Sequence, residues 1–344
     1  MAIIADKETQ YSSSLAKMRI LVTGAGGFIG HHLVRKLKED GHWVRGVDLK
    51  LPPWCDTKAD DFHLLDLREP AMAFAMTEGV SWVYHLAADM GGMGYLSKAH
   101  AQMIRNNTLI DINVIVAATK HKVQRFLFTS SACVYPCYLL QDDEPTSLKE
   151  SDTYPADPQG MYGWEKLHME HLCKSHRDAG WLDTRITRFQ NVYGSEETWR
   201  GGREKVIAAL SRKIAVAKFM GGNELKIWGD GKQSRSFLYI DDCIEGLVRM
   251  MHSDFPGPIN LGSARAVTVN WLADTLMDIA GVELEKVHVD GPEGVRARQS
   301  DNTLCQEKLG WEPTYPMEKG LAATYLWTEQ QVRNALEDGW TPQS

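Results

Sequence analysis

The sequence has no apolar run that approaches the roughly 20 residues needed to cross a bilayer. Its polar beginning, with Asp6, Lys7 and Glu8, also lacks the apolar core of a signal peptide. The six cysteines show no disulfide-scaffold spacing, and no second Cys/His pair accompanies Cys133 and Cys137. No HExxH motif surrounds His168 and His171. These absences predict a cytoplasmic protein without a membrane span, a structural disulfide or a metal site.

Positive charge is not in excess. The chain has 38 Lys and Arg against 45 Asp and Glu, which gives a formal net charge of −7. This balance argues against a nucleic-acid partner, and an anionic ligand would need a local group of Lys and Arg to hold it. With 344 residues and 43% hydrophobic content, the chain is long enough for a large α/β unit with a smaller lobe.

Short apolar runs alternate with helix-length segments over the first half of the chain. Buried strands are expected at 19–23, 44–48, 62–66, 82–87, 125–130 and 184–189. Helices are expected between them, at 28–40, 101–120 and 161–178. Alternation of this kind is typical of an α/β protein whose parallel sheet is covered by helices on both faces. We therefore predict a doubly wound parallel sheet.

A glycine-rich turn, GxxGxxG, follows the first expected strand and leads into the first expected helix. Gly24 permits a tight turn, Gly27 lets backbone amides approach a pyrophosphate, and Gly30 allows the helix to pack on the strand. Asp48 ends the second strand 24 residues after Gly24, where a ribose-binding acid is expected. Because a carboxylate repels a 2′-phosphate, the pattern favours NAD over NADP.

The rest of the expected NAD site surrounds this turn. Asp66 and Leu67 follow the third strand and would border the adenine, although Asp66 serves equally well as a helix N-cap. Phe28, Ile29 and Ala87, together with Tyr162 and Lys166 further along the chain, complete the set.

A change of pattern predicts the domain organisation. The alternation breaks after Asn191, where paired glycines at 201–202 and 221–222 mark loops. We expect a Rossmann-type NAD-binding domain over 18–190, to which 236–264 returns. A smaller C-terminal substrate-binding lobe is expected over 191–235 and 265–335, and a flexible extension over 1–17.

A YxxxK pair carries the expected chemistry. Tyr162 and Lys166 are four residues apart, so both side chains share one face of a helix. An ammonium beside the phenol favours tyrosinate, which makes Tyr162 a base for a sugar hydroxyl. Ser131 follows the fifth strand and would donate a hydrogen bond to the same substrate oxygen.

The motifs GxxGxxG, TSSxxVY and YxxxK, in this order, resemble those of the extended short-chain dehydrogenase/reductase class from about residue 18 to residue 327. Three runs, at 87–94, 130–133 and 201–205, are similar in particular to the GDP-mannose 3,5-epimerase family. The runs at 228–231 and 291–296 are similar as well, with looser parallels elsewhere in the class.

The resemblance implies an isomerase that converts GDP-α-D-mannose to GDP-β-L-galactose, and also to GDP-L-gulose. It oxidises C4 transiently with NAD and Tyr162, epimerises C5 and C3, and reduces C4 again. By similarity, Cys133 and Lys205 are the acid and base on opposite faces of the sugar. By themselves, Cys133 reads as a small buried apolar residue and Lys205 as a solvated lysine.

The resemblance also implies the substrate contacts. Gly94 approaches the sugar, Asn191 lies at the diphosphate, and Glu204 binds sugar hydroxyls. Five further side chains would hold the GDP phosphates, although each alone could be a surface group: Lys213, Gln233, Ser234, Arg235 and Arg298. Ser131, Ala132, Cys133 and Lys205 complete the expected substrate site.

Two expectations concern regions away from the catalytic residues. Trp228 is expected in the core of the lobe rather than as a platform for the base. A homodimer is the class expectation, through a four-helix interface formed by the helices at 101–120 and 161–178.

Two departures from the family and two rival functions remain open. Gln190 stands where histidine is expected, and the loop at 221–223 is longer. A nucleotide-sugar 4-epimerase or dehydratase shares the oxidation at C4, but a dehydratase would carry an Asp-Glu pair where Ala132 and Cys133 stand. A non-catalytic NAD-sensing regulator on the same fold would typically lack the tyrosine of the YxxxK pair.

Overall fold

The computed structural model describes residues 17–342, so nearly all of the predicted extension over 1–17 lies outside the described residues. The chain divides into two compact units. Unit 1 holds the described residues up to 88 together with 106–129 and 172–185, and unit 2 holds 89–105, 130–171 and the residues from 186 onward. The domain boundaries expected from the sequence, at 190–191, 235–236 and 264–265, remain a prediction.

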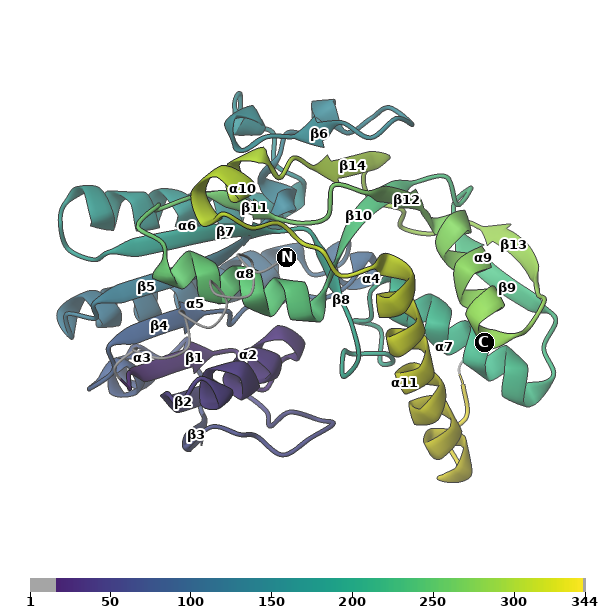
Figure 1. Ribbon diagram of the computed structural model, residues 1–344, viewed down its shortest axis with the longest axis horizontal. Coiled ribbons are helices and arrows are strands. Elements are labelled where there is room, and N and C mark those ends of the chain that lie inside the picture. Colours follow the sequence, from purple (N-terminus) through teal and green to yellow (C-terminus); the bar gives the residue numbers. More distant parts are fainter. Residues whose placement is uncertain (1–16, 343–344) are drawn as a thin grey trace, which may run out of the picture. The chain divides into compact units, whose positions relative to one another are not determined.

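Unit 1 is built on parallel strands in the order β3-β2-β1-β4-β5 (Figure 1). These strands are β1 (Arg19–Thr23), β2 (Trp43–Asp48), β3 (Asp61–Leu64), β4 (Trp82–His85) and β5 (Arg125–Ser131). The sheet continues through β7 (Thr184–Phe189) to β11 (Ile259–Leu261), which gives seven strands in all. The predicted doubly wound parallel sheet is confirmed. The division between the units passes through β5 and β7.

The helices that follow the strands lie where the sequence predicts them, apart from the one at 70–77, which was not predicted. They are α2 (Phe28–Glu39), α3 (Pro70–Thr77), α5 (His100–Lys120) and α6 (Gly160–Asp178), the last two shared between the units. Helix α2 begins at Phe28, within the glycine-rich segment, and carries two lysines in its last turn, where cations suit the helix dipole. Helix α3 begins on Pro70, whose missing N–H costs nothing at that position.

One predicted buried strand is wrong in extent and burial. The strand expected over 62–66 is β3, which ends at Leu64, and the side chain of Leu64 is 57% exposed. The reason is its position at the edge of the sheet, where only β2 pairs with it. The strand expected over 82–87 likewise ends at His85.

Unit 2 contains a five-stranded sheet in the order β12-β10-β14-β6, with β8 paired to β10, and a two-stranded sheet of β13 and β9. The strands are β6 (Ser147–Leu148), β8 (Asn191–Tyr193), β9 (Glu224–Trp228), β10 (Ser234–Tyr239), β12 (Ala266–Thr268), β13 (Glu285–Val289) and β14 (Ala297–Ser300).

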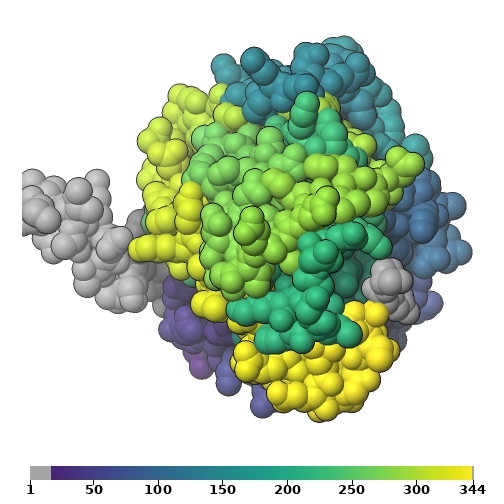
Figure 2. Space-filling model, turned by 90° about the vertical axis from the view of Figure 1, so that its right-hand side faces the viewer, coloured from purple at the N-terminus to yellow at the C-terminus, as the bar shows by residue number. Residues whose placement is uncertain are grey.

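The helices of unit 2 are mostly near the C-terminus. They are α4 (Met93–Leu96), α7 (Val206–Met220), α8 (Ile240–His252), α9 (Val269–Ala280), α10 (Thr303–Leu309) and α11 (Met317–Glu337), with short 3₁₀ turns η1 (Ala132–Val134), η2 (Cys137–Leu139) and η3 (Glu150–Thr153). Helices α7, α9 and α11 pack against one another and share one face of the molecule (Figure 2).

The expectation that Trp228 lies in the lobe core is wrong, because its side chain is 44% exposed. Strand β9 alternates exposed and buried residues, and Trp228 falls on the exposed side while Leu225 and Ile227 point inward. Between residues 17 and 342, no helix combines the length and the apolar character that a membrane crossing requires.

Candidate active site

The glycine turn of unit 1 leaves an open, amide-lined position at the start of α2. Gly27 is the N-cap residue and no side chain caps the helix. A Cβ at Gly27 would meet only the Gly24 carbonyl, at 3.2 Å, whereas a Cβ at Gly30 would lie 2.0 Å from the same oxygen. Gly30 is therefore required for packing, and the space beside Gly27 fits an anionic group at the helix N-terminus.

Asp48, at the end of β2, also supports this turn. Its Oδ2 accepts a hydrogen bond from the Gly26 amide at 3.0 Å, and its Oδ1 accepts from the amides of Leu49 at 2.6 Å and Lys50 at 3.3 Å. Burial raises the pKa of Asp48, and these three amides act against that rise. An acidic group at this position suits a ribose hydroxyl and disfavours a phosphate.

Asp66 and Leu67 lie in the loop after β3. Arg68 binds both carboxylate oxygens of Asp66, with Nε–O distances of 2.9 and 3.0 Å, and lowers its pKa. The N-cap of α3 is Glu69, so the alternative that Asp66 caps this helix is wrong. Leu67 is buried.

A buried chain of hydrogen bonds, the Thr23–His85–Asp111 relay, connects β1, β4 and α5 in unit 1. No motif in the sequence indicated it. Thr23 Oγ1 accepts hydrogen bonds from the amides of Leu86 and Ala87, both at 3.1 Å, so its proton is donated to His85 Nδ1 at 2.8 Å. His85 Nε2 therefore carries the ring proton and donates to Asp111 Oδ1 at 2.8 Å. The relay holds the predicted cofactor residue Ala87 beside the glycine turn.

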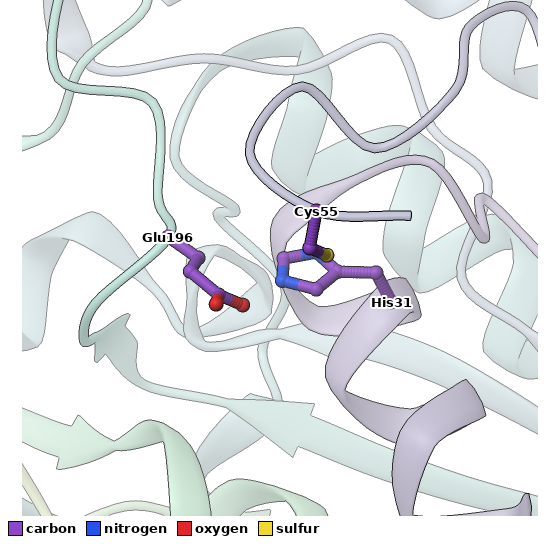
Figure 3. Close-up of side chains that lie close together, drawn as sticks. All are labelled: His31, Cys55 and Glu196. Carbon is purple, nitrogen blue, oxygen red and sulfur yellow. The ribbon is translucent and has the colours of Figure 1, made fainter. Parts of the chain in front are cut away.

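His31 is a second residue near the turn that was not predicted. Its Nδ1 donates to the Gly27 carbonyl at 2.8 Å, from within α2. Figure 3 shows His31 on this helix and Cys55 on the loop that follows β2. Arg35 Nη2 donates to Cys55 Sγ at 3.9 Å.

The end of β5 in unit 2 places Ser131 and Cys133 together. Ser131 caps η1, and its Oγ accepts a hydrogen bond from the Cys133 amide at 3.1 Å. The Cys133 thiol donates to Gln159 Oε1 at 3.6 Å, and the Cys133 carbonyl accepts from the Gln159 amide at 2.8 Å. Ala132 between them is fully buried. Cys133 is thus fixed at two points and remains partly exposed.

Helix α6 brings the YxxxK pair to the same segment. The side chain of Lys166 is 2% exposed, and its Nζ lies 5.6 Å from the ring centroid of Tyr162 and 3.4 Å from Glu165 Oε1. A Cβ at Gly163 would lie 2.1 Å from the Cys133 carbonyl oxygen, so only glycine lets the helix lie this close to η1. The predicted residues Ser131, Cys133, Tyr162 and Lys166 therefore occupy one region of unit 2.

Lys205 is the N-cap residue of α7. Burial lowers the pKa of Lys205, the negative forms of Glu197, Cys243 and Cys133 raise it, and Arg298 lowers it further. We call Cys133, Lys205, Arg298 and Glu197 the acid–base cluster. Its members come from η1, the N-terminus of α7, β14 and the loop after β8.

Arg298 presents unused hydrogen-bond donors inside unit 2. It lies across from Arg235 where β14 pairs with β10. Arg298 is 5% exposed, and neither its Nε nor its Nη1 has a partner among the described residues. Gln233 Oε1 and Ser234 Oγ are also buried and have no hydrogen-bond partner among the described residues. Buried donors of this kind fit a bound anion.

Arg235 is engaged with backbone carbonyls of its own unit. Its guanidinium donates to the backbone carbonyls of Ser234 at 2.7 Å, Arg296 at 3.1 Å and Glu293 at 3.3 Å, and also to that of Val295. Burial, and then Arg298, lowers its pKa to about 9. Arg235 therefore holds the 293–296 loop, and Arg298 has the unused donors.

The remaining predicted substrate residues are held by their own neighbours. Glu204 Oε1 accepts from Arg212 Nη2 at 3.1 Å, Lys213 Nζ donates to the Lys226 carbonyl at 2.7 Å, and Asn191 Nδ2 donates to the Ser236 carbonyl at 3.2 Å. Burial lowers the pKa of Lys213. A Cβ at Gly94 would lie 3.4 Å from the Trp228 ring. None of these contacts reaches Cys133 or Tyr162.

Glu197 and Gln190 are two buried polar side chains of unit 2 to which the sequence motifs assign no role. Glu197 is 3% exposed and its Oε1 has no partner within the described chain, and neither amide atom of the buried Gln190 has one. Gln190 was recognised as a departure from the family. Glu197 gave no signal, because a Glu-Glu pair in a loop reads as solvated surface.

The amino-acid sequence of this chain matches a known protein family. The NAD dependent epimerase/dehydratase family matches residues 20–262. GDP-mannose 3,5-epimerase 1 of Oryza sativa subsp. japonica is 45% identical over 94% of this chain and 85% of its own length, and GDP-mannose 3,5-epimerase of Arabidopsis thaliana is 44% identical over the same shares.

Solved structures agree with the fold. UDP-glucose 4-epimerase from Thermotoga maritima, solved with UDP-glucose, has a TM-score of 0.81 and 28% identity, over 92% of this chain and all of that one (100%). The chain therefore belongs to the NAD dependent epimerase/dehydratase family and, within it, to the GDP-mannose 3,5-epimerases.

Proposed function

We propose that this protein is an NAD-dependent isomerase that converts GDP-α-D-mannose to GDP-β-L-galactose, and also to GDP-L-gulose. The substrate is assigned from the GDP-mannose 3,5-epimerases, which are 44–45% identical over 94% of the chain. The observation that carries the assignment is the close approach of α6 to η1, where only glycine at 163 fits against the Cys133 carbonyl, so that Cys133 lies next to the YxxxK pair.

The residues of unit 1 suit the cofactor of this family. The uncapped start of α2 beside Gly27 would hold the pyrophosphate of NAD, and Asp48 its adenosine ribose. Phe28, Ile29, Asp66, Leu67 and Ala87 remain assigned to the same site. When bound, NAD supplies a reversible hydride acceptor at C4 of the sugar.

Tyr162 removes the proton of the sugar 4-hydroxyl in this proposal. The buried ammonium of Lys166 close to the phenol ring favours the phenolate form, and Ser131 supplies a hydroxyl next to the reacting oxygen. Loss of this proton together with transfer of the C4 hydride to bound NAD would give a ketone at C4, which would acidify the protons at C3 and C5.

Cys133 and Lys205 then carry the inversions. One group removes a proton from one face of the ring and the other donates a proton to the opposite face. The unused donors of Arg298 would bind the diphosphate, with Gln233, Ser234, Asn191 and Lys213 as further contacts. Arg235 supports this site through the 293–296 loop, Gly94 and Glu204 are assigned to the sugar, and Ala132 to the wall beside Cys133.

The decisive test is incubation of the purified protein with GDP-mannose in D₂O, with the deuterium located by NMR. We expect deuterium at C5 and C3 together with GDP-L-galactose. Deuterium-free product inverted only at C4 would indicate a 4-epimerase instead, and loss of water would indicate a dehydratase. Retention of NAD without isotope exchange would indicate a regulator.

We further propose a cytosolic homodimer. Six free cysteines suit a reducing compartment. Leu109, Ile112 and Val116 form an exposed apolar stripe on α5, and Met161 and Trp164 are exposed on α6. Sedimentation of the wild-type protein and of Ile112→Glu tests the interface, since the charged variant is expected to be monomeric.

A further inference from the structure

Two sequence runs that carry the family resemblance, 87–94 and 201–205, meet in the structure. Gly92 of the first run and Arg203 of the second both lie in unit 2, and the Gly92 amide donates a hydrogen bond to the Arg203 carbonyl at 3.0 Å. The second run ends with Lys205, the proposed acid–base residue. The contact between the runs therefore reaches the backbone two residues before Lys205.

This contact is too close for any side chain at Gly92. A Cβ there would lie 2.3 Å from the Glu204 carbonyl oxygen and 3.6 Å from the Lys205 Cα. The first distance is far shorter than van der Waals contact, so a larger residue would displace the 201–205 loop. Gly92 is also the N-cap residue of α4, whose Gly94 is assigned to the sugar. The approach therefore sets the spacing between α4 and Lys205.

Side chains add to the same contact. The Arg203 guanidinium lies over the Tyr95 ring, 3.8 Å from its centroid. Its Nη1 donates to Asp89 Oδ1 at 3.0 Å and to the Met90 carbonyl at 3.1 Å. The Tyr95 hydroxyl donates to the same Asp89 oxygen at 2.7 Å. We call Asp89, Gly92, Tyr95 and Arg203 the loop clamp.

The loop clamp is poorly suited to stabilising the fold, but it is well suited to fixing geometry. The Arg203 side chain is 47% exposed, and ion pairs of exposed side chains contribute little to stability. A planar guanidinium that stacks on an aromatic ring and also donates to a carboxylate is held in one orientation. These contacts hold the backbone before Lys205. Helix α7 holds Lys205 itself, because the Ala209 amide donates to the Lys205 carbonyl at 2.9 Å.

We propose that Arg203 is a positioning residue for Lys205. The loop clamp keeps Lys205 within reach of the sugar carbon whose proton it transfers, and this inference rests on the acid–base role of Lys205 proposed above. Proton transfer needs donor and acceptor within hydrogen-bond reach, and a displacement of about 1 Å can cost about 10²-fold in rate. The oxidation at C4 uses the YxxxK pair instead, so it should not depend on the loop clamp.

The test separates the inversions from the oxidation in Arg203→Met, which removes the guanidinium and keeps much of the side-chain length. We expect formation of GDP-L-galactose to fall about tenfold, with KM for GDP-mannose changed less than about twofold. The rate at which reduced cofactor appears in a single turnover should stay at the wild-type value. Arg203→Lys, which can still pair with Asp89, should recover part of the loss. Gly92→Ala, whose Cβ would meet the Glu204 carbonyl, should lower the same rate by about 10²-fold.

Arg265→Met is the matched control. Arg265 has a 49% exposed side chain, pairs with Glu318 at 2.7 Å, and lies 4.8 Å from the Trp271 ring centroid in the same unit. It therefore makes the same kinds of contact as Arg203 outside the loop clamp, and its variant should keep wild-type rates. Equal rates of GDP-L-galactose formation in the two Met variants would overturn the proposal. An equal loss of oxidation and inversion in Arg203→Met would also overturn it, because the clamp would then only support the fold.

Amide hydrogen exchange tests the loop clamp without substrate. The Gly92 amide should be protected in the wild type and in Arg265→Met, and it should exchange at least about tenfold faster in Arg203→Met. Unchanged protection of Gly92 in Arg203→Met would overturn the clamp whether or not the protein is active. A wild type that forms no GDP-L-galactose would instead refute the proposed function, and the exchange data would still decide the clamp.

Discussion

The glycine turn of unit 1 consists of consecutive residues, Gly24 to Gly30, and presents mainly backbone amides. The acid–base cluster of unit 2 consists of side chains from η1, the N-terminus of α7, β14 and the loop after β8. The turn needs the absence of side chains, whereas the cluster needs polar and charged side chains that come from several separate segments, two of them, Glu197 and Arg298, buried. The two sites should therefore respond differently to substitution. Changes in the turn should alter cofactor affinity, and changes among the catalytic and substrate residues of unit 2 should alter the rate or the KM for the sugar nucleotide.

The largest expected effect is that of Tyr162→Phe, which should lower the rate of epimerisation and leave NAD affinity unchanged. Tyr162→Phe keeps the ring packed but removes the proton acceptor, so the rate of epimerisation should fall by about 10²–10⁴-fold while NAD binding is retained. Steady-state rates and NAD titration measure the two quantities. A variant that keeps more than roughly a hundredth of the wild-type rate would contradict the general-base role.

Cys133→Ala should affect the inversions and spare the first step. Tyr162 and Lys166 remain in place, so a 4-keto sugar should form, while deuterium incorporation at the inverted centre falls by at least about 10²-fold. Cys133→Ser is the matched variant, since a hydroxyl of similar size is a much weaker acid than a thiol. Absorbance of the reduced cofactor and NMR of the product follow the two steps. If Cys133→Ala forms GDP-L-galactose at the normal rate, Cys133 has only a packing role and is not an acid or base in the reaction.

Arg298→Met should weaken substrate binding with a smaller effect on the chemical step. Loss of charge-assisted hydrogen bonds worth about 1.5–3 kcal/mol corresponds to roughly 10–100-fold in KM for GDP-mannose. Arg265→Met is the control, because Arg265 is a surface residue with a 49% exposed side chain that pairs with Glu318 in the same unit. Equal KM values for the two variants would show that Arg298 does not bind the diphosphate.

The smallest expected effect tests the turn. Asp48→Ala removes the ribose acceptor and the support for the Gly26 amide, so NAD should bind about tenfold more weakly and NADP should be rejected less. Asp48→Asn keeps an acceptor for Gly26 but lacks the charge. Titration with both cofactors distinguishes these roles, and an unchanged preference in Asp48→Asn would assign the discrimination to other residues.

Local pattern was sufficient for much of unit 1. The three helices predicted at 28–40, 101–120 and 161–178 begin and end within one residue of α2, α5 and α6. Their periodicity, and the glycine turn before the first of them, depend on neighbours a few residues away. The extent of β3 could not be predicted in the same way, because its exposure follows from its edge position in the sheet.

Sequence by itself determined the parallel α/β architecture, the cofactor turn and the YxxxK pair, because each is encoded by spacing along a continuous segment. Tertiary structure alone revealed the Thr23–His85–Asp111 relay and the burial of Glu197. It also showed that Arg235 holds a loop while Arg298 keeps unused donors. The physical reason is that desolvation and charge pairing depend on which distant segments fold around a side chain, and the local sequence carries no record of them.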